Sequence, residues 1–340
     1  MIGRALRLVL PLAILCSGPA AWHIYPVAGY SSTAGFILGG LVGTRWSQGR
    51  FRTTASWSTK GEISLVPELH LSRTPVGLDA ELRVEKRFDR RFYGYGNGGD
   101  PDVYAEYDTE FQHLSLLAGL EVLDGTDLSL GGVLRHSTVY RRESDSLWRT
   151  SPTEHYGSEW TAGPALEARR RFDSPLPGYV YLSLLHQEGS DVSYSRAGGG
   201  AALFVPLSQT TVLGIHGNLS RHFGTSRTPF WFQQYLGYDQ GLRGYDDNRF
   251  SGNVFVVGNL ELRQLVYRMG RGRRSMGVGL VGFLDAGEVA DGLPGLRMDE
   301  LHFDAGLGGR LYLPGGVVMV ADFAFSPEGF KMATGFDEQF

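Results

Sequence analysis

The chain has 340 residues, a formal net charge of −4, 48 glycines, 12% aromatic residues and one cysteine. A mildly acidic chain is a poor candidate for general nucleic-acid binding, and a single thiol excludes a disulfide scaffold and a cysteine-ligated metal centre. Beyond the N-terminal segment, no stretch approaches the roughly eighteen consecutive apolar residues of a membrane-spanning helix. If the protein crosses a membrane, it must therefore do so as a closed barrel of strands.

The N-terminal segment has the layout of a secretory signal peptide. Arg4 and Arg7 precede a short apolar run over residues 8–16, and small residues follow it. This order of charged, apolar and small residues is typical of a secretion signal. We therefore expect a signal peptide over residues 1–20 and one outer-membrane barrel domain over residues 21–340.

Cys16, the only cysteine, lies at the end of the apolar run. A lipid anchor at Cys16 is the weaker alternative, because Leu15 before it is bulky for a lipoprotein processing site. Cleavage near Ala20 leaves a mature chain without a thiol. It also removes the two positive charges of Arg4 and Arg7, which changes the formal net charge from −4 to −6.

The segment from Leu78 to Glu85 alternates strictly between apolar and charged residues. Every even position is apolar and every odd position, starting with Asp79, is charged. A strand satisfies this pattern with lipid or core on one face and water on the other. Four ionisable side chains on one face do not fit a dry sandwich core, because unpaired buried charges cost several kcal/mol each. The pattern favours a water-filled barrel over a soluble β-sandwich.

The same period of two recurs toward the C-terminus, where Leu280 and Leu284 alternate with Phe283 and Asp285. Clusters of turn residues separate such runs and indicate sixteen strands, an even number that suits a bacterial single-chain barrel. We predict an all-β fold, a 16-stranded antiparallel transmembrane β-barrel. The expected strands cover residues 22–30, 33–47, 51–58, 62–72, 77–88, 107–122, 128–141, 159–173, 177–187, 193–205, 209–222, 251–267, 276–286, 302–313, 316–325 and 330–340.

Alternate connections between these strands differ in length. Five of them are short turns, whereas residues 89–106, 142–158, 223–250 and 287–301 form long polar segments. In outer-membrane barrels the short turns face the periplasm and the long loops face outside. The longest connection, residues 223–250, is therefore expected on the external side.

That longest loop and a later strand carry two motifs that resemble a known family. Leu242-Arg243-Gly244-Tyr245 looks like the arginine-glycine-aromatic loop motif of the BamA and TamA superfamily of outer-membrane assembly barrels, also called bacterial surface-antigen barrels. Phe283, Asp285 and Gly287 resemble its phenylalanine, aspartate and glycine strand motif. Weaker similarities around Tyr25-Pro26 and over residues 92–97 are like those of the subgroup without N-terminal POTRA domains. The resemblance covers the whole mature barrel, but its specific motifs lie mainly between residues 229 and 340.

The resemblance implies that the long loop folds back into the lumen, where Arg243 meets Asp285. A guanidinium in a confined pore needs a carboxylate partner, Gly244 permits close backbone approach, and Tyr245 offers a flat packing surface. The parity of Asp285, opposite to that of Leu284, also points its side chain inward. The plainer alternative is a solvated loop arginine without contact to Asp285. Inward parity suggests further members of a lumen network at Glu261, Arg263, Asp304, Arg310 and Asp322.

The lateral seam between the first and last strands is a further feature of the family that this chain resembles. The first strand contains Pro26, which cannot donate a ladder hydrogen bond, and the last strand is expected to end at Phe340. Their pairing should therefore be weak. In assembly barrels this seam is thought to open toward lipid and to template or admit a client strand. An ordinary closed seam is an equally supported alternative.

We therefore expect a protein that assists outer-membrane protein or lipid assembly, with no enzymatic activity, no cofactor and no metal. Expected partners are outer-membrane lipids and either client outer-membrane proteins or a separate periplasmic protein, without nucleic acid. The alternative function is a passive or plugged pore. A lipid hydrolase using Ser220 is a weaker hypothesis, since no carboxylate is fixed near Ser220, His216 or His222 by the sequence.

Overall fold

The computed structural model describes residues 22–31, 34–73, 76–141, 157–173, 176–224, 229–270, 275–314, 317–336 and 340, so the predicted signal peptide lies outside the described residues. Eighteen strands and four short 3-10 helices make up this part of the chain. The barrel strands are β1 (Trp22–Ser31), β2 (Gly35–Trp46), β3 (Gly49–Ser58), β4 (Ile63–Arg73), β5 (Val76–Phe92), β6 (Ala105–Leu123), β7 (Thr126–Arg141), β8 (Ser158–Phe172), β9 (Gly178–Gly189), β10 (Ser193–Pro206), β11 (Thr211–Gly224), β14 (Val254–Met269), β15 (Met276–Ala290), β16 (His302–Leu313), β17 (Val317–Ser326) and β18 (Gly329–Phe336).

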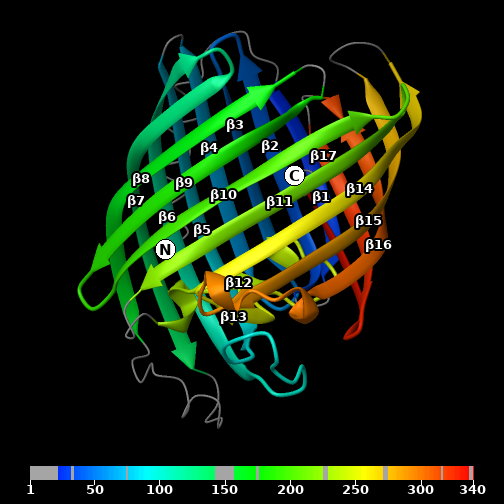
Figure 1. The fold of residues 1–340 in the computed structure, drawn as a ribbon. Helices are drawn as coiled ribbons and strands as arrows, with labels where there is room; N and C mark the ends of the chain where they lie inside the picture. Colours follow the sequence, from blue (N-terminus) through cyan, green and yellow to red (C-terminus); the bar gives the residue numbers. More distant parts are fainter. Residues whose placement is uncertain are drawn as a thin grey trace.

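These sixteen strands form one closed antiparallel barrel within the described residues. Each strand pairs with its neighbours along the chain, except that β11 pairs with β14 and that β1 closes the barrel against β18. Figure 1 shows the strands tilted around the barrel, with the labelled pair β12 and β13 at its lower end. The predicted 16-stranded antiparallel barrel is therefore confirmed. Among the described residues, no helix is long and apolar enough to span a membrane.

Side chains alternate between the outer and inner faces of the wall, as the period of two predicts. Leu182 and Leu284 are exposed on the outer face, by 67% and 57%. On the inner face Asp285 is only 1% exposed. Arg83, in the alternating segment of β5, lies 3.3 Å from Glu81 on the same face. The apolar outer face suits lipid, and charged side chains on the inner face pair with one another.

The connection between β11 and β14 contains structure of its own, and we call its residues 229–253 the inner loop. It holds the 3-10 helices η1 (Phe230–Phe232) and η2 (Tyr238–Gln240) and a small sheet of β12 (Gln234–Leu236) and β13 (Phe250–Gly252). The prediction that a wall strand begins at residue 251 is therefore wrong. Residues 250–252 form β13, whose backbone pairs with β12 in the inner loop and not with the wall. The wall strand β14 begins at Val254.

The C-terminal residue does not lie where the sequence suggested. The strand β18 covers Gly329–Phe336, and residues 337–339 of the expected strand lie outside the described residues. The Phe340 ring stacks on His216 with centroids 5.0 Å apart, and the guanidinium of Arg263 lies 4.8 Å from its centroid. His216 and Arg263 belong to β11 and β14, so the placement of Phe340 at the lateral seam is corrected. A cation and an imidazole face give this ring a stacking site inside the lumen.

The two remaining 3-10 helices, η4 (Leu293–Gly295) and η5 (Met298–Glu300), lie in the connection between β15 and β16. This connection and the inner loop emerge from the same end of the barrel, which we call the long-loop end. Isolated contacts link the loops there: Gly96 bridges Ser251, and Asn97 accepts a hydrogen bond of 2.9 Å from the backbone N–H of Val289. The connection after β5 thus packs against the inner loop and narrows the mouth of the barrel.

We predict that a charge on the outer face destabilises the barrel far more than the same charge on the inner face. Leu182→Arg places a guanidinium in lipid near the middle of β9 and should cost about 2–4 kcal/mol of unfolding free energy. Tyr181→Arg is the matched control, because Tyr181 is the half-buried neighbour on the opposite face. Urea unfolding from lipid vesicles measures both. Equal losses for the two variants would contradict the assignment of the faces.

Candidate functional site

The inner loop presents Arg243 from a tight turn. Gly241 ends η2 with a left-handed φ of 103°, a conformation that glycine adopts without steric cost. Leu242 then enters an apolar cluster that includes Leu236, Tyr245 and Val257. With the residues on both sides of it packed, Arg243 points toward the barrel wall and is 0% exposed.

Three carboxylates on the wall surround this guanidinium. Asp285 of β15 receives hydrogen bonds of 2.7 Å from both Nε and Nη2 of Arg243. Glu261 of β14 lies 2.5 Å from Nη1, and Asp322 of β17 lies 3.6 Å from it. Two parallel bonds to one carboxylate are the geometry that a planar guanidinium satisfies and an ammonium does not. Burial alone would lower the pKa of Arg243, but hydrogen bonding to Asp285 and the nearby negative charges raise it, so the side chain stays charged.

Phe283 and Gly287, the other members of the strand motif, shape the floor of this site. The ring of Phe283 lies under the guanidinium of Arg243 at 3.6 Å from its centroid, a cation–π arrangement. A side chain at Gly287 would meet the Cδ2 atom of Leu236 at 2.8 Å. The absence of a side chain there lets the strand β12 of the inner loop pack directly against β15.

Gly244 and Tyr245 fix the loop on the other side of the arginine. A Cβ at Gly244 would lie 2.6 Å from that of Asp304, so only glycine fits the approach. Its carbonyl accepts a hydrogen bond of 2.7 Å from the Ser326 hydroxyl, and the Tyr245 hydroxyl donates one of 3.1 Å to the carbonyl of Phe303. Burial, together with the charges of Glu328 and Asp304, raises the pKa of Tyr245 to about 12. Tyr245 therefore acts here as a neutral hydrogen-bond donor.

The predicted lumen network is present, but its members do not all pair. Arg310 Nη1 lies 2.5 Å from Asp322, and Arg263 Nε lies 2.7 Å from Glu261. Asp304 sits directly opposite Asp285 in the ladder between β15 and β16, and neither of its carboxyl oxygens has a hydrogen-bond partner of good geometry among the described residues. Asp304 thus lies beside Asp285 and the inner loop without an ion pair of its own among the described residues.

Asn259 and Ser326 belong to the site, although the sequence patterns did not select them. Asn259 Nδ2 donates to the carbonyl of Gly241 at 2.7 Å and to Asp285 at 2.8 Å, so it joins the loop to the strand motif. Its inward parity, shared with Glu261, was an available signal. For Ser326 the sequence offered no comparable signal, because its contact depends on the path of the loop backbone.

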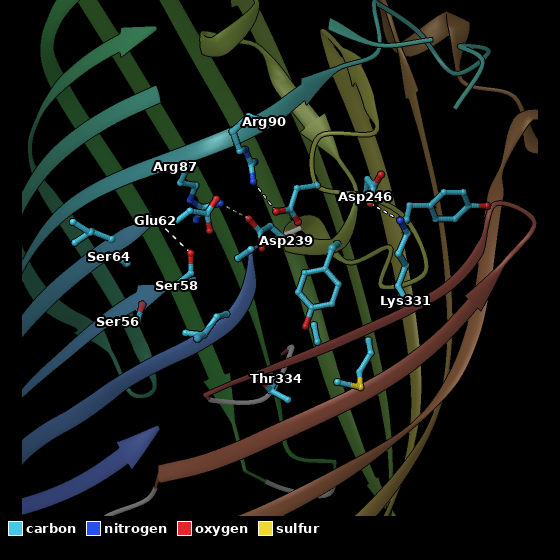
Figure 2. Close-up of a pocket in the computed structure, with 18 residues that line it drawn as sticks. Ser56, Ser58, Glu62, Ser64, Arg87, Arg90, Asp239, Asp246, Lys331 and Thr334 are labelled. Atoms are coloured by element: carbon cyan, nitrogen blue, oxygen red, sulfur yellow. Dashed lines mark hydrogen bonds and ion pairs between the residues drawn. The ribbon is translucent and has the colours of Figure 1, made fainter. Parts of the chain in front are cut away.

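A second set of charges holds the inner loop against β5. Arg87 lies 3.2 Å from Asp239, and Arg90 lies 2.6 Å from Asp247. Burial works against the charge of Asp239, but Arg87 and Arg90 lower its pKa, whereas burial and the charge of Asp239 raise the pKa of Asp247. These pairs line a polar cavity of about 270 Å³ to which Lys331 of β18 also contributes. Figure 2 shows Arg87, Arg90, Asp239 and Lys331 around it. The cavity reaches the inner side of the seam.

The seam between β1 and β18 has far fewer registered contacts than the rest of the wall. In the part of the chain that the structure describes, its pairing consists of one residue pair, Ser31 opposite Ala333. In contrast, β1 pairs with β2 along its whole length, with Pro26 opposite Gly40. Next to that pair, the backbone N–H of Tyr30 donates to the hydroxyl of Thr334 at 3.1 Å, so a side chain takes the place of a ladder partner.

The structure separates the residues of the hydrolase alternative. His216 contacts the Asn259 side chain at 3.0 Å, and the Ser220 hydroxyl donates to the carbonyl of Ala197 at 3.4 Å. Ser220 therefore has no base within hydrogen-bond distance among the described residues. Those residues also contain no group of three His, Cys, Asp or Glu side chains placed to hold a metal ion.

We predict that removing the Arg243 charge destabilises both the loop and the barrel. Arg243→Met leaves Asp285 buried without its cation and takes from Glu261 one of its two arginine partners, which should cost about 3–5 kcal/mol of unfolding free energy and speed proteolysis of the inner loop. Arg297→Met is the control, since Arg297 is exposed and should change stability by less than about 0.5 kcal/mol. Urea unfolding and limited proteolysis measure the two effects.

A charge exchange separates the pair from its surroundings. Arg243→Asp combined with Asp285→Arg should recover part of the stability that each single variant loses, because the two side chains still face each other. If the double variant is no more stable than the single variants, the Arg243–Asp285 pair does not hold the inner loop to the wall.

Two solved structures have a similar fold. BamA from Haemophilus ducreyi lacking POTRA domains 1-3 is similar with a TM-score of 0.58 and 15% identity, over 94% of this chain and 70% of that chain. CdiB from Escherichia coli is similar with a TM-score of 0.61 and 12% identity, over 95% of this chain and 68% of that chain. At these identities the likeness concerns the fold, and no curated protein sequence matches the chain. A model of the Omp85 superfamily domain matches residues 100–336, and the chain therefore belongs to this superfamily of outer-membrane barrels.

Proposed function

We propose that this barrel assists the assembly of outer-membrane proteins or lipids through its weak lateral seam, while the inner loop plugs the lumen. The observation that carries the proposal is a contrast in the wall: within the described residues β1 and β18 share one registered pair, whereas the flanking pairs β1–β2 and β17–β18 are continuous ladders. Membership of the Omp85 superfamily supports an assembly or secretion role in the outer membrane.

The seam leaves backbone groups of β1 without strand partners. In antiparallel sheets an unpaired edge offers N–H and C=O groups to another strand, and in lipid such groups are costly unless they find partners. Among the described residues, β1 has no registered partner on the β18 side from Trp22 to Tyr30. An extended segment of a client protein satisfies these groups by pairing, and lipid packing next to the seam is perturbed.

The ion pairs of Arg243 with Asp285, Glu261 and Asp322, which we call the Arg243 latch, support this function from within the lumen. The carboxylate partners of Arg243 lie on β14, β15 and β17, the wall that leads to β18. By tying the inner loop to this wall, the latch keeps the lumen filled and the wall rigid, so that motion is concentrated at the seam. No covalent chemistry is required. The proposed partners are outer-membrane lipids and either client barrels or a separate periplasmic protein.

Locking the seam tests the proposal. Ser31→Cys combined with Ala333→Cys places a disulfide at the registered pair of β1 and β18. In cells depleted of the native protein, the oxidised variant should fail to restore the outer-membrane proteins or lipids that fall in abundance, and reduction should rescue it. A disulfide between Ser183→Cys and Gly198→Cys, on the paired strands β9 and β10, is the control. Full activity of the locked seam would contradict the proposal.

A plugged or passive pore is the second candidate, favoured by the charged lumen. Arg83 lies 3.3 Å from Glu81 and Arg87 lies 3.1 Å from Glu85 on the inner face of β5, and such charged pairs suit a water-filled interior. The two candidates differ in conductance. A plugged assembly barrel should conduct weakly in a planar bilayer and strongly after residues 229–249 are deleted. A large steady conductance that the deletion does not increase would favour the passive pore.

A further inference from the structure

We infer that Asp246 is a strap that holds the seam closed by binding Lys331 of the last strand, and that its release is a condition for opening. The inference rests on the proposed function of the seam. It assigns the closing force to one carboxylate of the inner loop that is distinct from the Arg243 latch.

Asp246 connects two parts of the wall that do not touch through their backbones. Its Oδ1 accepts a hydrogen bond of 2.5 Å from Nζ of Lys331 in β18. Its Oδ2 accepts hydrogen bonds of 2.7 Å from the Tyr93 hydroxyl and 3.2 Å from Arg91. Arg91 lies at the end of β5, and Tyr93 is the residue after that strand. Each oxygen therefore serves one side of the seam. The strands β1 to β4 lie between the two anchors in the barrel order.

Lys331 is well placed to control the seam. It lies on the same face of β18 as Ala333, two residues away, and Ala333 supplies the registered pair with β1. On its other side β18 is held by a ladder with β17. Because the described residues form one registered pair on the β1 side, the ion pair of Lys331 with Asp246 supplies a large part of what holds this free side of β18 in place.

The strap is charged and shielded from solvent. The side chain of Asp246 is 12% exposed and that of Lys331 is 21% exposed. Burial would raise the pKa of Asp246, but hydrogen bonds from Lys331 and Tyr93 and the charge of Arg91 lower it below the usual value. The carboxylate is therefore ionised at neutral pH. Partly buried pairs are less screened than exposed ones, so this contact is stronger than an ordinary surface salt bridge.

The inner loop gives the strap a fixed anchor. Asp246 follows Arg243-Gly244-Tyr245, whose contacts with β14, β15 and β16 hold the loop backbone in place. The Asp246–Lys331 pair borders the polar cavity of about 270 Å³, which Thr334 and Arg87 also line (Figure 2). A released Lys331 side chain has room to move into this cavity without unfolding the loop.

Labelling of a buried seam position tests the strap. Ala333 is 7% exposed, so a cysteine at that position reacts with a maleimide mainly when the seam opens. In a Cys16→Ala background with Ala333→Cys, both Asp246→Asn and Lys331→Met should raise the labelling rate on the order of tenfold, which corresponds to about 1.4 kcal/mol of lost closing energy. The combined exchange Asp246→Lys with Lys331→Asp should return the rate toward that of the parent.

The controls make each outcome decisive. Asp299→Asn removes an exposed carboxylate whose side chain is 67% exposed and should leave the rate unchanged. Lys331→Met changes β18 and leaves the inner loop unaltered. If Asp246→Asn raises the labelling rate above that of the parent and Lys331→Met does not, the strap is overturned, because the effect then comes from a disturbed loop. Slow labelling of both would also overturn it.

Failure of the strap and failure of the proposed function are distinguishable. If labelling responds as expected but the disulfide-locked seam still supports assembly, the strap stands and the assembly function fails. If the locked seam abolishes assembly but neither Asp246→Asn nor Lys331→Met changes labelling, the assembly function stands and another contact closes the seam.

Discussion

The desolvation of one guanidinium governs the arrangement of the inner loop and the wall around it. A charge taken out of water costs several kcal/mol unless opposite charges and hydrogen bonds replace the lost hydration. Arg243 has no solvent exposure, and Asp285, Glu261 and Asp322 replace its water from three different strands. Asp285 in turn needs the arginine, because no other cation pairs with it among the described residues, whereas Glu261 and Asp322 also pair with Arg263 and Arg310. Loop and wall therefore stabilise each other only in this one position.

This mutual dependence explains the small residues of the motif. Gly244 lies against Asp304, and Gly287 lies against Leu236, at distances that leave no space for a Cβ. Close backbone approach brings the guanidinium into bidentate range of Asp285 and brings β12 onto β15. The apolar cluster around Leu236 and Tyr245 then excludes water from the ion pairs, which strengthens them because the local dielectric constant is low.

Local periodicity can be detected in the sequence and predicts the strands and their faces, whereas contacts that depend on closure of the barrel cannot be predicted in this way. The opposite faces of Leu284 and Asp285 result from a period of two, which every strand must obey. The small sheet of β12 and β13 is missed because three-residue strands carry no periodic signal. The position of Phe340 beside Arg263 is missed for a different reason: it depends on which side chains the closed wall brings together. The contact between Asp246 and Lys331 spans 85 residues and becomes visible only once β18 has returned next to β1.

Charge segregation inside the lumen gives the inner loop a unique orientation. The wall from β14 to β17 is rich in carboxylates and takes the loop arginine, whereas β5 presents Arg87 and Arg90 and takes the loop carboxylates Asp239 and Asp247. A loop rotated in the lumen would bring like charges together, which costs free energy where water is scarce. Asp246 is the exception that joins both regions, since it binds Arg91 near one wall and Lys331 at the seam. The same electrostatic pattern that fixes the inner loop therefore also reaches the weakly paired seam between β1 and β18 in the described part of the wall.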